Sequence, residues 1–405
     1  MSYLYQPARI ASSYRPLMFR NSRTTTADAE YLICDVYVNT SLKGTFRKPW
    51  TSSAGAYLFD VDVQSIVSRN CAPYTTAKTS IFGTLDNKEL TSSTDLLTQY
   101  YLYSELEIRN SSGYLETVAG SGETSNTLYA LPSIRSMQDV SMDDYYQPSA
   151  GGDFLFLTNA PAEQNVGTDE NFFISWLVYG TNALNLIFYN AAGSATHNVV
   201  VTTASGVTDD RVASVGIGPA NIVGTGSLTL ASGTWPTSFA SIAYYTFSAG
   251  TYSGSYTRKS ELRRLNVVPR CEWSQRVYWM GPTGGPEQYT FTGQIIRQQT
   301  DEGTVGELAP RWDLTSTPPV QGYQRGVVKL DIETQVEIEV LEPVDPYTGA
   351  WLRGLRSSPE VYLEVDGKYR VITVKPGQTE YERSREGVSE FKAVLIVDRE
   401  STQEI

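Results

Sequence analysis

The side chains of this 405-residue chain that could do acid–base or nucleophilic chemistry are few and widely spaced. The single histidine, His197, stands beside the apolar run HNVVV. Hydrolytic triads and most transition-metal sites use histidine, so one histidine without a neighbouring cysteine excludes their common forms. We therefore expect no catalytic residue, and we interpret the chain as something other than an enzyme.

Carboxylates occur in adjacent or alternate pairs at Asp60/Asp62, Asp143/Asp144 and Asp209/Asp210. On a strand, Asp60 and Asp62 would share a face, which makes a Ca²⁺ site conceivable, but no EF-hand spacing supports it. Solvated or locally hydrogen-bonded acids are the favoured interpretation. A glycosidase-type pair of acids stays open, because its two carboxylates can come from anywhere in the chain.

Two glycine-rich stretches invite comparison with phosphate-binding loops. GPTGGP (281–286) lacks the Lys-Ser/Thr ending of a P-loop, and its prolines remove backbone donors that a phosphate would need. GIGPAN (216–221) lacks a third glycine, and we expect no helix after it. Both are predicted to be turns, and no cofactor is expected.

Composition narrows the class of partner. The formal net charge is −12, with 44 acidic and 32 basic residues, so nucleic acid is not expected as a partner. Cys34, Cys71 and Cys271 are too sparse for a disulfide framework or a zinc site, so no metal is expected and the thiols should be reduced and mostly buried. The 27 tyrosines suit strands and half-exposed subunit contacts.

The start of the chain has no signal-peptide pattern and no run could span a bilayer, so we expect synthesis in a cytoplasm, which does not exclude export inside a particle.

Alternating Val, Ile, Tyr and Thr segments, broken by Gly, Pro, Asn and Ser, predict an all-β chain of tandem sandwich or barrel domains with very few short helices. In EYLICDVYVN the pattern places Leu32, Cys34, Val36 and Val38 on one face of a strand. Further expected strands and hairpins are AYLFDVDV, YYLYSELEI, NFFISWLVYG, ALNLIFYN, HNVVVTT, SIAYYTFSAG, RVYWM before the turn at 281–286, VYLEV-DG-KYRVITV and EFKAVLIV. A short helix is expected where Trp351, Leu352 and Leu355 share a face, ending before Pro359.

Composition shifts predict four segments. These are an N-terminal β-sandwich over 1–120, a linker or extended loops over 121–165, a charge-poor sandwich over 166–257 and a C-terminal β-domain over 258–405. The last segment opens with the basic run TRKSELRRL. Charge runs are usually solvated, so the run predicts an exposed face of the protein. The functional alternative is that the run contacts an acidic surface of a neighbouring subunit. The seven tryptophans include candidates for sugar stacking, although core packing is favoured for each.

The C-terminal third resembles tail-associated structural proteins of tailed bacteriophages, in particular those of Bacteroidetes-type hosts. The resemblance lies in RVYWMGPTGGPEQYTFTGQI, VEIEVLEP, WLRGLRSSPEVYLEVDGKYRVITV and FKAVLIV, and FDVDVQSIVSR near the N-terminus is similar as well. It implies a distal-tail or baseplate-like protein of the virion that assembles as a homo-oligomeric ring and links the tail to host-binding components. The charge-poor middle segment departs from a minimal ring protein and leaves receptor binding open.

Three functions follow for testing. The first is a non-enzymatic ring-forming tail subunit, whose partners are its own copies and other tail proteins. The second is an adhesin that recognises host surface glycan, and the third a polysaccharide depolymerase, disfavoured because no β-helical repeats are visible. The residues expected at subunit contacts are Arg258, Lys259, Arg263, Arg264, Trp279, Tyr289 and Trp351.

Overall fold

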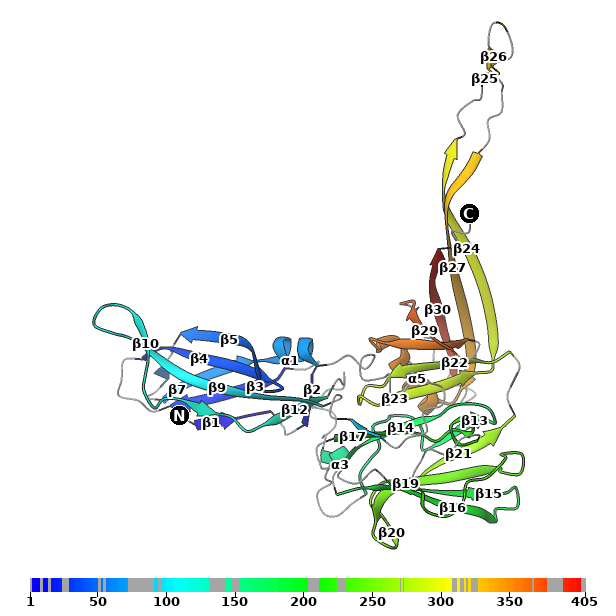
Figure 1. The fold of residues 1–405 in the computed structure, drawn as a ribbon, viewed down its shortest axis with the longest axis horizontal. Helices are drawn as coiled ribbons and strands as arrows, with labels where there is room; N and C mark the ends of the chain where they lie inside the picture. Colours follow the sequence, from blue (N-terminus) through cyan, green and yellow to red (C-terminus); the bar gives the residue numbers. More distant parts are fainter. Residues whose placement is uncertain are drawn as a thin grey trace. The chain divides into compact units, whose positions relative to one another are not determined.

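The computed structural model describes most of the chain, and it is built almost entirely of strands, as the sequence predicts (Figure 1). The described residues are 2–7, 10–13, 16–23, 29–49, 52–53, 56–71, 91–93, 97–131, 143–146, 153–178, 180–202, 211–223, 230–269, 271, 273–307, 312–313, 317, 320–321, 327–365, 368–376 and 389–401. They divide into two compact units: Met1–Arg270 with Trp279–Gln288, and Cys271–Tyr278 with Tyr289–Ile405. Within the described residues, no helix has the length and apolar character needed to span a membrane.

The N-terminal part of the first unit is a pair of sheets around one core. One sheet has the order β1-β3-β7-β6, with strands β1 (Ser2–Tyr5), β3 (Met18–Arg23), β7 (Ala56–Asp62) and β6 (Ser52–Ser53). The other has the order β2-β12-β9-β4-β5, with strands β2 (Ile10–Ser12), β12 (Leu128–Leu131), β9 (Thr98–Arg109), β4 (Ala29–Val38) and β5 (Ser41–Pro49), while β10 (Leu115–Thr117) and β11 (Glu123–Thr124) also pair with β9. The short helix α1 (Gln64–Asn70) follows β7.

The alternation predicted for β4 is confirmed. Leu32, Cys34, Val36 and Val38 are at most 2% exposed and belong to the core between the sheets. The domain boundary predicted at residue 120 does not coincide with the end of the sheet, because β11 and β12 pair with β9. The strand residues themselves are not the Gly and Ser of this segment, and Leu128 and Ala130 of β12 belong to the core between the sheets.

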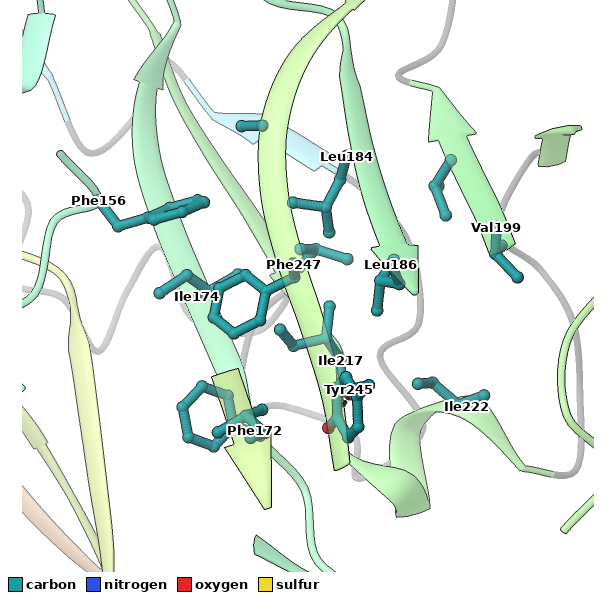
Figure 2. Close-up of a cluster of buried hydrophobic side chains, with 14 of the residues drawn as sticks. Phe156, Phe172, Ile174, Leu184, Leu186, Val199, Ile217, Ile222, Tyr245 and Phe247 are labelled. Carbon is teal, nitrogen blue, oxygen red and sulfur yellow. Dashed lines mark hydrogen bonds between the residues drawn. The ribbon is translucent and has the colours of Figure 1, made fainter. Parts of the chain in front are cut away.

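The middle part of the first unit has a larger core (Figure 2). Its main sheet has the order β13-β21-β19-β15-β16-β18, with strands β13 (Glu163–Gly167), β21 (Arg263–Val268), β19 (Tyr244–Tyr252), β15 (Ala183–Tyr189), β16 (Ala195–Thr202) and β18 (Leu230–Ser232), and β20 (Tyr256–Arg258) pairs with β19. A second sheet has the order β14-β17-β8, with strands β14 (Phe173–Val178), β17 (Arg211–Gly216) and β8 (Thr91–Ser93). Figure 2 shows Ile174, Leu186 and Phe247 of three different strands turned toward one another.

β21 pairs with both β13 and β19, so the middle sheet continues past residue 257, where the sequence predicted a domain boundary. One prediction for this part needs correction. A four-residue helix, α4 (Pro219–Ile222), begins directly after Gly218, where we expected none. Asn221 explains it, since its Oδ1 accepts from the backbone N–H groups of Gly218 and Phe172 at 3.0 and 2.8 Å. A further helix, α3 (Asp143–Tyr146), lies in the stretch predicted to be a linker.

The C-terminal sheet has the order β23-β22-β28-β29-β30-β27-β24. Its strands are β22 (Gln275–Met280), β23 (Pro286–Phe291), β24 (Gln294–Glu307), β27 (Val327–Val344), β28 (Val361–Val365), β29 (Lys368–Val374) and β30 (Ser389–Ser401), and β25 (Trp312–Asp313) pairs separately with β26 (Val320–Gln321). Helix α5 (Pro346–Ser357) buries Trp351, Leu352 and Leu355, as predicted. The Asp-Gly pair at 366–367 lies outside the described residues, but Val365 and Lys368 on either side of it are paired in a hairpin.

Candidate assembly interface

The basic cluster lies at the surface of the first unit, with one exception. Arg258 forms an ion pair with Asp153 at 2.7 Å, and Lys259 is exposed. Arg264 is paired with Glu163 at 3.0 Å, and its guanidinium lies 3.9 Å from the ring centre of Tyr244. Two of the three exposed cations therefore already have acidic partners within the chain, which limits what they can offer another subunit.

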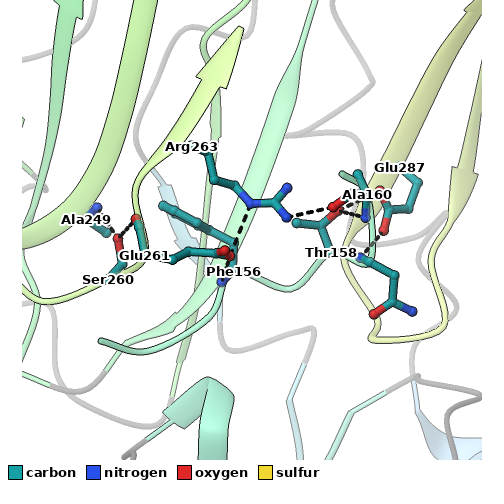
Figure 3. A network of polar contacts seen from close by, with 9 residues as sticks. Phe156, Thr158, Ala160, Ala249, Ser260, Glu261, Arg263 and Glu287 are labelled. Atoms are coloured by element: carbon teal, nitrogen blue, oxygen red, sulfur yellow. Dashed lines mark hydrogen bonds and ion pairs between the residues drawn. The ribbon is translucent and has the colours of Figure 1, made fainter. Parts of the chain in front are cut away.

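Arg263 is the exception, because its side chain is only 8% exposed (Figure 3). Its Nε donates to Glu261 at 3.1 Å, and its terminal nitrogen donates to the carbonyl of Ala160 at 2.7 Å. The same carboxylate of Glu261 accepts from the backbone N–H of Phe156 at 3.0 Å. Arg263 thus joins the 156–160 segment to β21, and its expected contact with another subunit stays a prediction.

The three predicted aromatic contacts are also internal. Trp279 and Trp351 are 1% and 6% exposed. Tyr289 is half-buried, with its ring 5.7 Å from that of Trp351, and burial raises the pKa of its hydroxyl well above the usual value. These side chains pack within the chain, and their expected part in a subunit contact stays a prediction.

The glycine-rich turn 281–286 is a packed turn and not a phosphate loop. The N–H of Gly281 donates to the carbonyl of Gly285 at 2.8 Å, and Gly284 has a φ of +84°. Glu287, 1% exposed, accepts from the hydroxyl of Thr158 at 2.7 Å and from the N–H of Asn159 at 2.8 Å (Figure 3). The carboxylate satisfies donors of a neighbouring segment, which is a structural role.

The remaining chemistry candidates are local contacts. Asp60 forms two hydrogen bonds with Arg20 at 2.7 and 2.8 Å, which lower the pKa of its carboxyl, and Asp62 accepts from the N–H groups of Leu17 and Gln64. His197 stands 3.2 Å from the hydroxyl of Thr196. Asp209 and Asp210 lie outside the described residues. Elsewhere in the described chain, no three His, Cys, Asp or Glu side chains form a group that could hold a metal ion.

A surface that the sequence did not point to is the outer edge of the C-terminal sheet. β24 is the last strand in the sheet order and pairs with β27 from Gln294↔Leu341 to Glu307↔Val327. β30 pairs with β27 only over 333–344, so in the described chain the part of the hairpin formed by 303–307 of β24 and 327–332 of β27 is two-stranded. Ile296 on β24 is 36% exposed. The long alternation in VVKLDIETQVEIEV was the available signal for such a strand, but nothing local identified its partner.

Tyrosines form a second kind of surface. Tyr37 and Tyr101 stack across β4 and β9 with ring centres 4.9 Å apart and an interplanar angle of 3°. In the middle sheet, the rings of Tyr189 on β15 and Tyr244 on β19 stack with their centres 4.7 Å apart. Arg264 on β21, the strand on the other side of β19, lies over the ring of Tyr244. Both faces of Tyr244 are thereby occupied.

Comparisons with known proteins do not identify a family. No protein-family model and no curated protein matches the chain. Among solved structures, a GH family 64 laminaripentaose-producing beta-1,3-glucanase from Paenibacillus barengoltzii aligns over 76% of this chain and 65% of its own, with 10% identity and a TM-score of 0.14. The chain thus spans less than two thirds of that protein, and a TM-score this low carries no structural argument.

Proposed function

We propose that the chain is a non-enzymatic structural subunit of a virion, a ring-forming tail or baseplate component that joins the tail to host-binding parts. The observation that carries the proposal is that β24 is the terminal strand of the C-terminal sheet in the described part of the chain. A terminal strand presents a row of backbone donors and acceptors that can pair with a strand of another chain. The resemblance of the C-terminal third to tail-associated phage proteins supplies the setting, and contacts that repeat around an axis close into a ring.

The length and composition of β24 favour an edge that pairs with another chain over an edge that stays in contact with solvent. Strands in globular proteins are usually about 3–10 residues long, whereas β24 has 14 and contains neither proline nor lysine. Proteins that remain monomeric commonly blunt their edges with those residues or keep them short. β24 is neither short nor interrupted by proline, although Arg297, Asp301 and Glu302 place charges along it and the register shifts between Thr304 and Val305.

Adjacent proline variants on β24 test the proposal. Neighbouring N–H groups in a strand point to opposite edges, so of Gln298→Pro and Gln299→Pro one removes a donor toward β27 and the other removes a donor from the outer edge. The inward variant should lower the thermal unfolding temperature and serves as the matched control. The outward variant should unfold close to wild type and lose oligomers in mass photometry and negative-stain electron microscopy.

Two results would contradict the proposal. One is a wild-type chain that stays monomeric when concentrated, and the other is an outward proline variant that assembles as wild type does. The alternative of a glycan-binding adhesin keeps its own test, binding of the full chain to a glycan array. It gains little from the middle sheet, because sugars stack on ring faces and both faces of Tyr244 are covered.

A further inference from the structure

The outer side of the N-terminal sheet carries a concentration of tyrosines. Leucine, cysteine and valine side chains of β4 fill the core, so the residues between them face outward. Half-buried tyrosines occupy that outer side on three strands, and we name them the tyrosine face: Tyr31 and Tyr37 on β4, Tyr101 and Tyr103 on β9, and Tyr129 on β12. Leu42, 52% exposed and opposite Tyr37 on β5, extends this surface to a fourth strand.

Acidic groups are interleaved with these rings. Asp35 lies opposite Tyr103, and Glu105 lies opposite Ile33 in the same register. Asp35 accepts from the hydroxyl of Thr45 at 2.6 Å, and Glu105 accepts from the hydroxyl of Tyr103. Both of these donors are neutral hydroxyls, so neither hydrogen bond neutralises a carboxylate.

Glu107, the next acidic residue on this face, is paired with a cation, but only one of its two carboxylate oxygens accepts a hydrogen bond. Arg47 donates to Oε1 of Glu107 at 2.8 Å, while Oε2 of Glu107 is buried and has no hydrogen-bond partner. Glu107 is 6% exposed, and a buried charged oxygen without a donor costs free energy. The three carboxylates described here, those of Asp35, Glu105 and Glu107, thus outnumber Arg47, the one cation that an ion pair places among them.

Ring orientation decides between a sugar and a protein as the occupant. The rings of Tyr37 and Tyr101 cover one another at 4.9 Å, so they do not form a flat floor. The hydroxyl end of Tyr103 packs against Gly122, just before β11, because a Cβ on Gly122 would come within 2.2 Å of the hydroxyl oxygen. Hydroxyl groups and ring edges beside carboxylates suit a protein surface that carries guanidinium groups, which pair with carboxylates in two contacts and lie against aromatic rings.

We propose that the tyrosine face is a docking surface for an arginine-bearing segment of a neighbouring protein subunit. The inference deepens the proposed function and rests on it for the identity of the partner as a subunit. It concerns the N-terminal sheet alone, so it stands apart from pairing along β24. Tyrosine and arginine are the residues that most often dominate binding at protein interfaces.

The test measures binding of a capped hexa-arginine peptide to the full chain by isothermal titration calorimetry at physiological salt. Wild type should bind hexa-arginine more tightly than hexalysine. The double variant Asp35→Asn/Glu105→Gln should weaken hexa-arginine binding by about tenfold, as expected for loss of two carboxylate contacts. Tyr101→Ser should weaken it as well, which attraction to net charge alone would not explain.

Glu116→Gln is the matched control, because Glu116 is an exposed carboxylate on β10 of the same sheet but carries no tyrosine neighbour in the face. Its affinity should equal that of wild type, and circular dichroism should show that all variants remain folded. The inference is overturned if the tyrosine-face variants and Glu116→Gln bind hexa-arginine equally. A chain that binds the peptide as expected but never self-assembles would refute the proposed ring while leaving this surface in place.

Discussion

Glu342 should be one of the most sensitive positions of the C-terminal unit. Its side chain lies at the corner where β23 leads into β24, and it is 5% exposed. The carboxylate accepts from the N–H groups of Thr292 and Gly293 at 3.0 and 2.6 Å, and from the hydroxyls of Thr292 and Tyr289 at 3.2 and 3.3 Å. It therefore satisfies the backbone donors of the corner that begins the edge strand.

The size of the effect follows from these contacts. Glu342→Ala leaves two backbone donors without an acceptor, and each orphaned buried group costs about 1–3 kcal/mol. Removing the buried charge recovers part of its desolvation cost. We expect a net loss of about 2–5 kcal/mol, and a smaller loss for Glu342→Gln, which keeps one acceptor oxygen.

Urea unfolding followed by circular dichroism measures the loss, and hydrogen exchange localises it to residues 289–298. Glu339→Ala is the matched control on the same strand, because Glu339 pairs with Lys392 at 2.7 Å in a half-exposed setting and should cost at most about 1 kcal/mol. Equal losses for Glu342→Ala and Glu339→Ala, or unchanged exchange at 289–298, would refute the reasoning.

Three further outcomes are expected. Gly285→Ala should lower the unfolding temperature, because its Cβ would stand 1.8 Å from the carbonyl oxygen of Leu157. Asp345→Ala should cost about 1 kcal/mol at pH 7, since Asp345 caps α5 by accepting from two backbone N–H groups. Burial of Asp345 tends to raise the pKa of its carboxyl, but the hydrogen bonds that it accepts outweigh burial and lower this pKa. The stabilisation by Asp345 is therefore complete above its unfolded pKa of about 3.9 and is lost as the pH falls through the lower folded pKa. Urea unfolding of wild type and Asp345→Ala at several pH values measures this loss. At pH 8, Ellman's reagent should label one thiol, the exposed Cys271, because burial raises the pKa of Cys34 to about 11 and Cys71 is buried too, while three should react in guanidinium chloride.

Strand patterns in the sequence were sufficient for the fold class and for the inward faces. The alternation in β4 and the spacing of Trp351 and Leu355 in α5 predicted which side chains are buried. They could do so because every second residue of a strand, and residues three or four apart in a helix, lie on the same face. Pairing between distant strands was not predictable, since nothing local in QIIRQQT specifies that it lies beside β27. The same limit applies to Arg263: it belongs to a charged run that predicts a solvated face, but a segment remote in sequence buries it.

The two edges of the C-terminal sheet are treated differently, and the difference bears on assembly. At one edge, β23 begins with Pro286, and the side-chain amide of Gln288 both accepts from the N–H and donates to the carbonyl of Phe173, at 3.0 Å in each case. That amide imitates a strand partner, so the donors and acceptors nearby are already used. At the other edge, β24 is the terminal strand in the described part of the chain and pairs with β27 on its inner side. Under the proposed function, the edge at β23 would be closed to another chain and the edge at β24 would be the place where a neighbouring subunit is added.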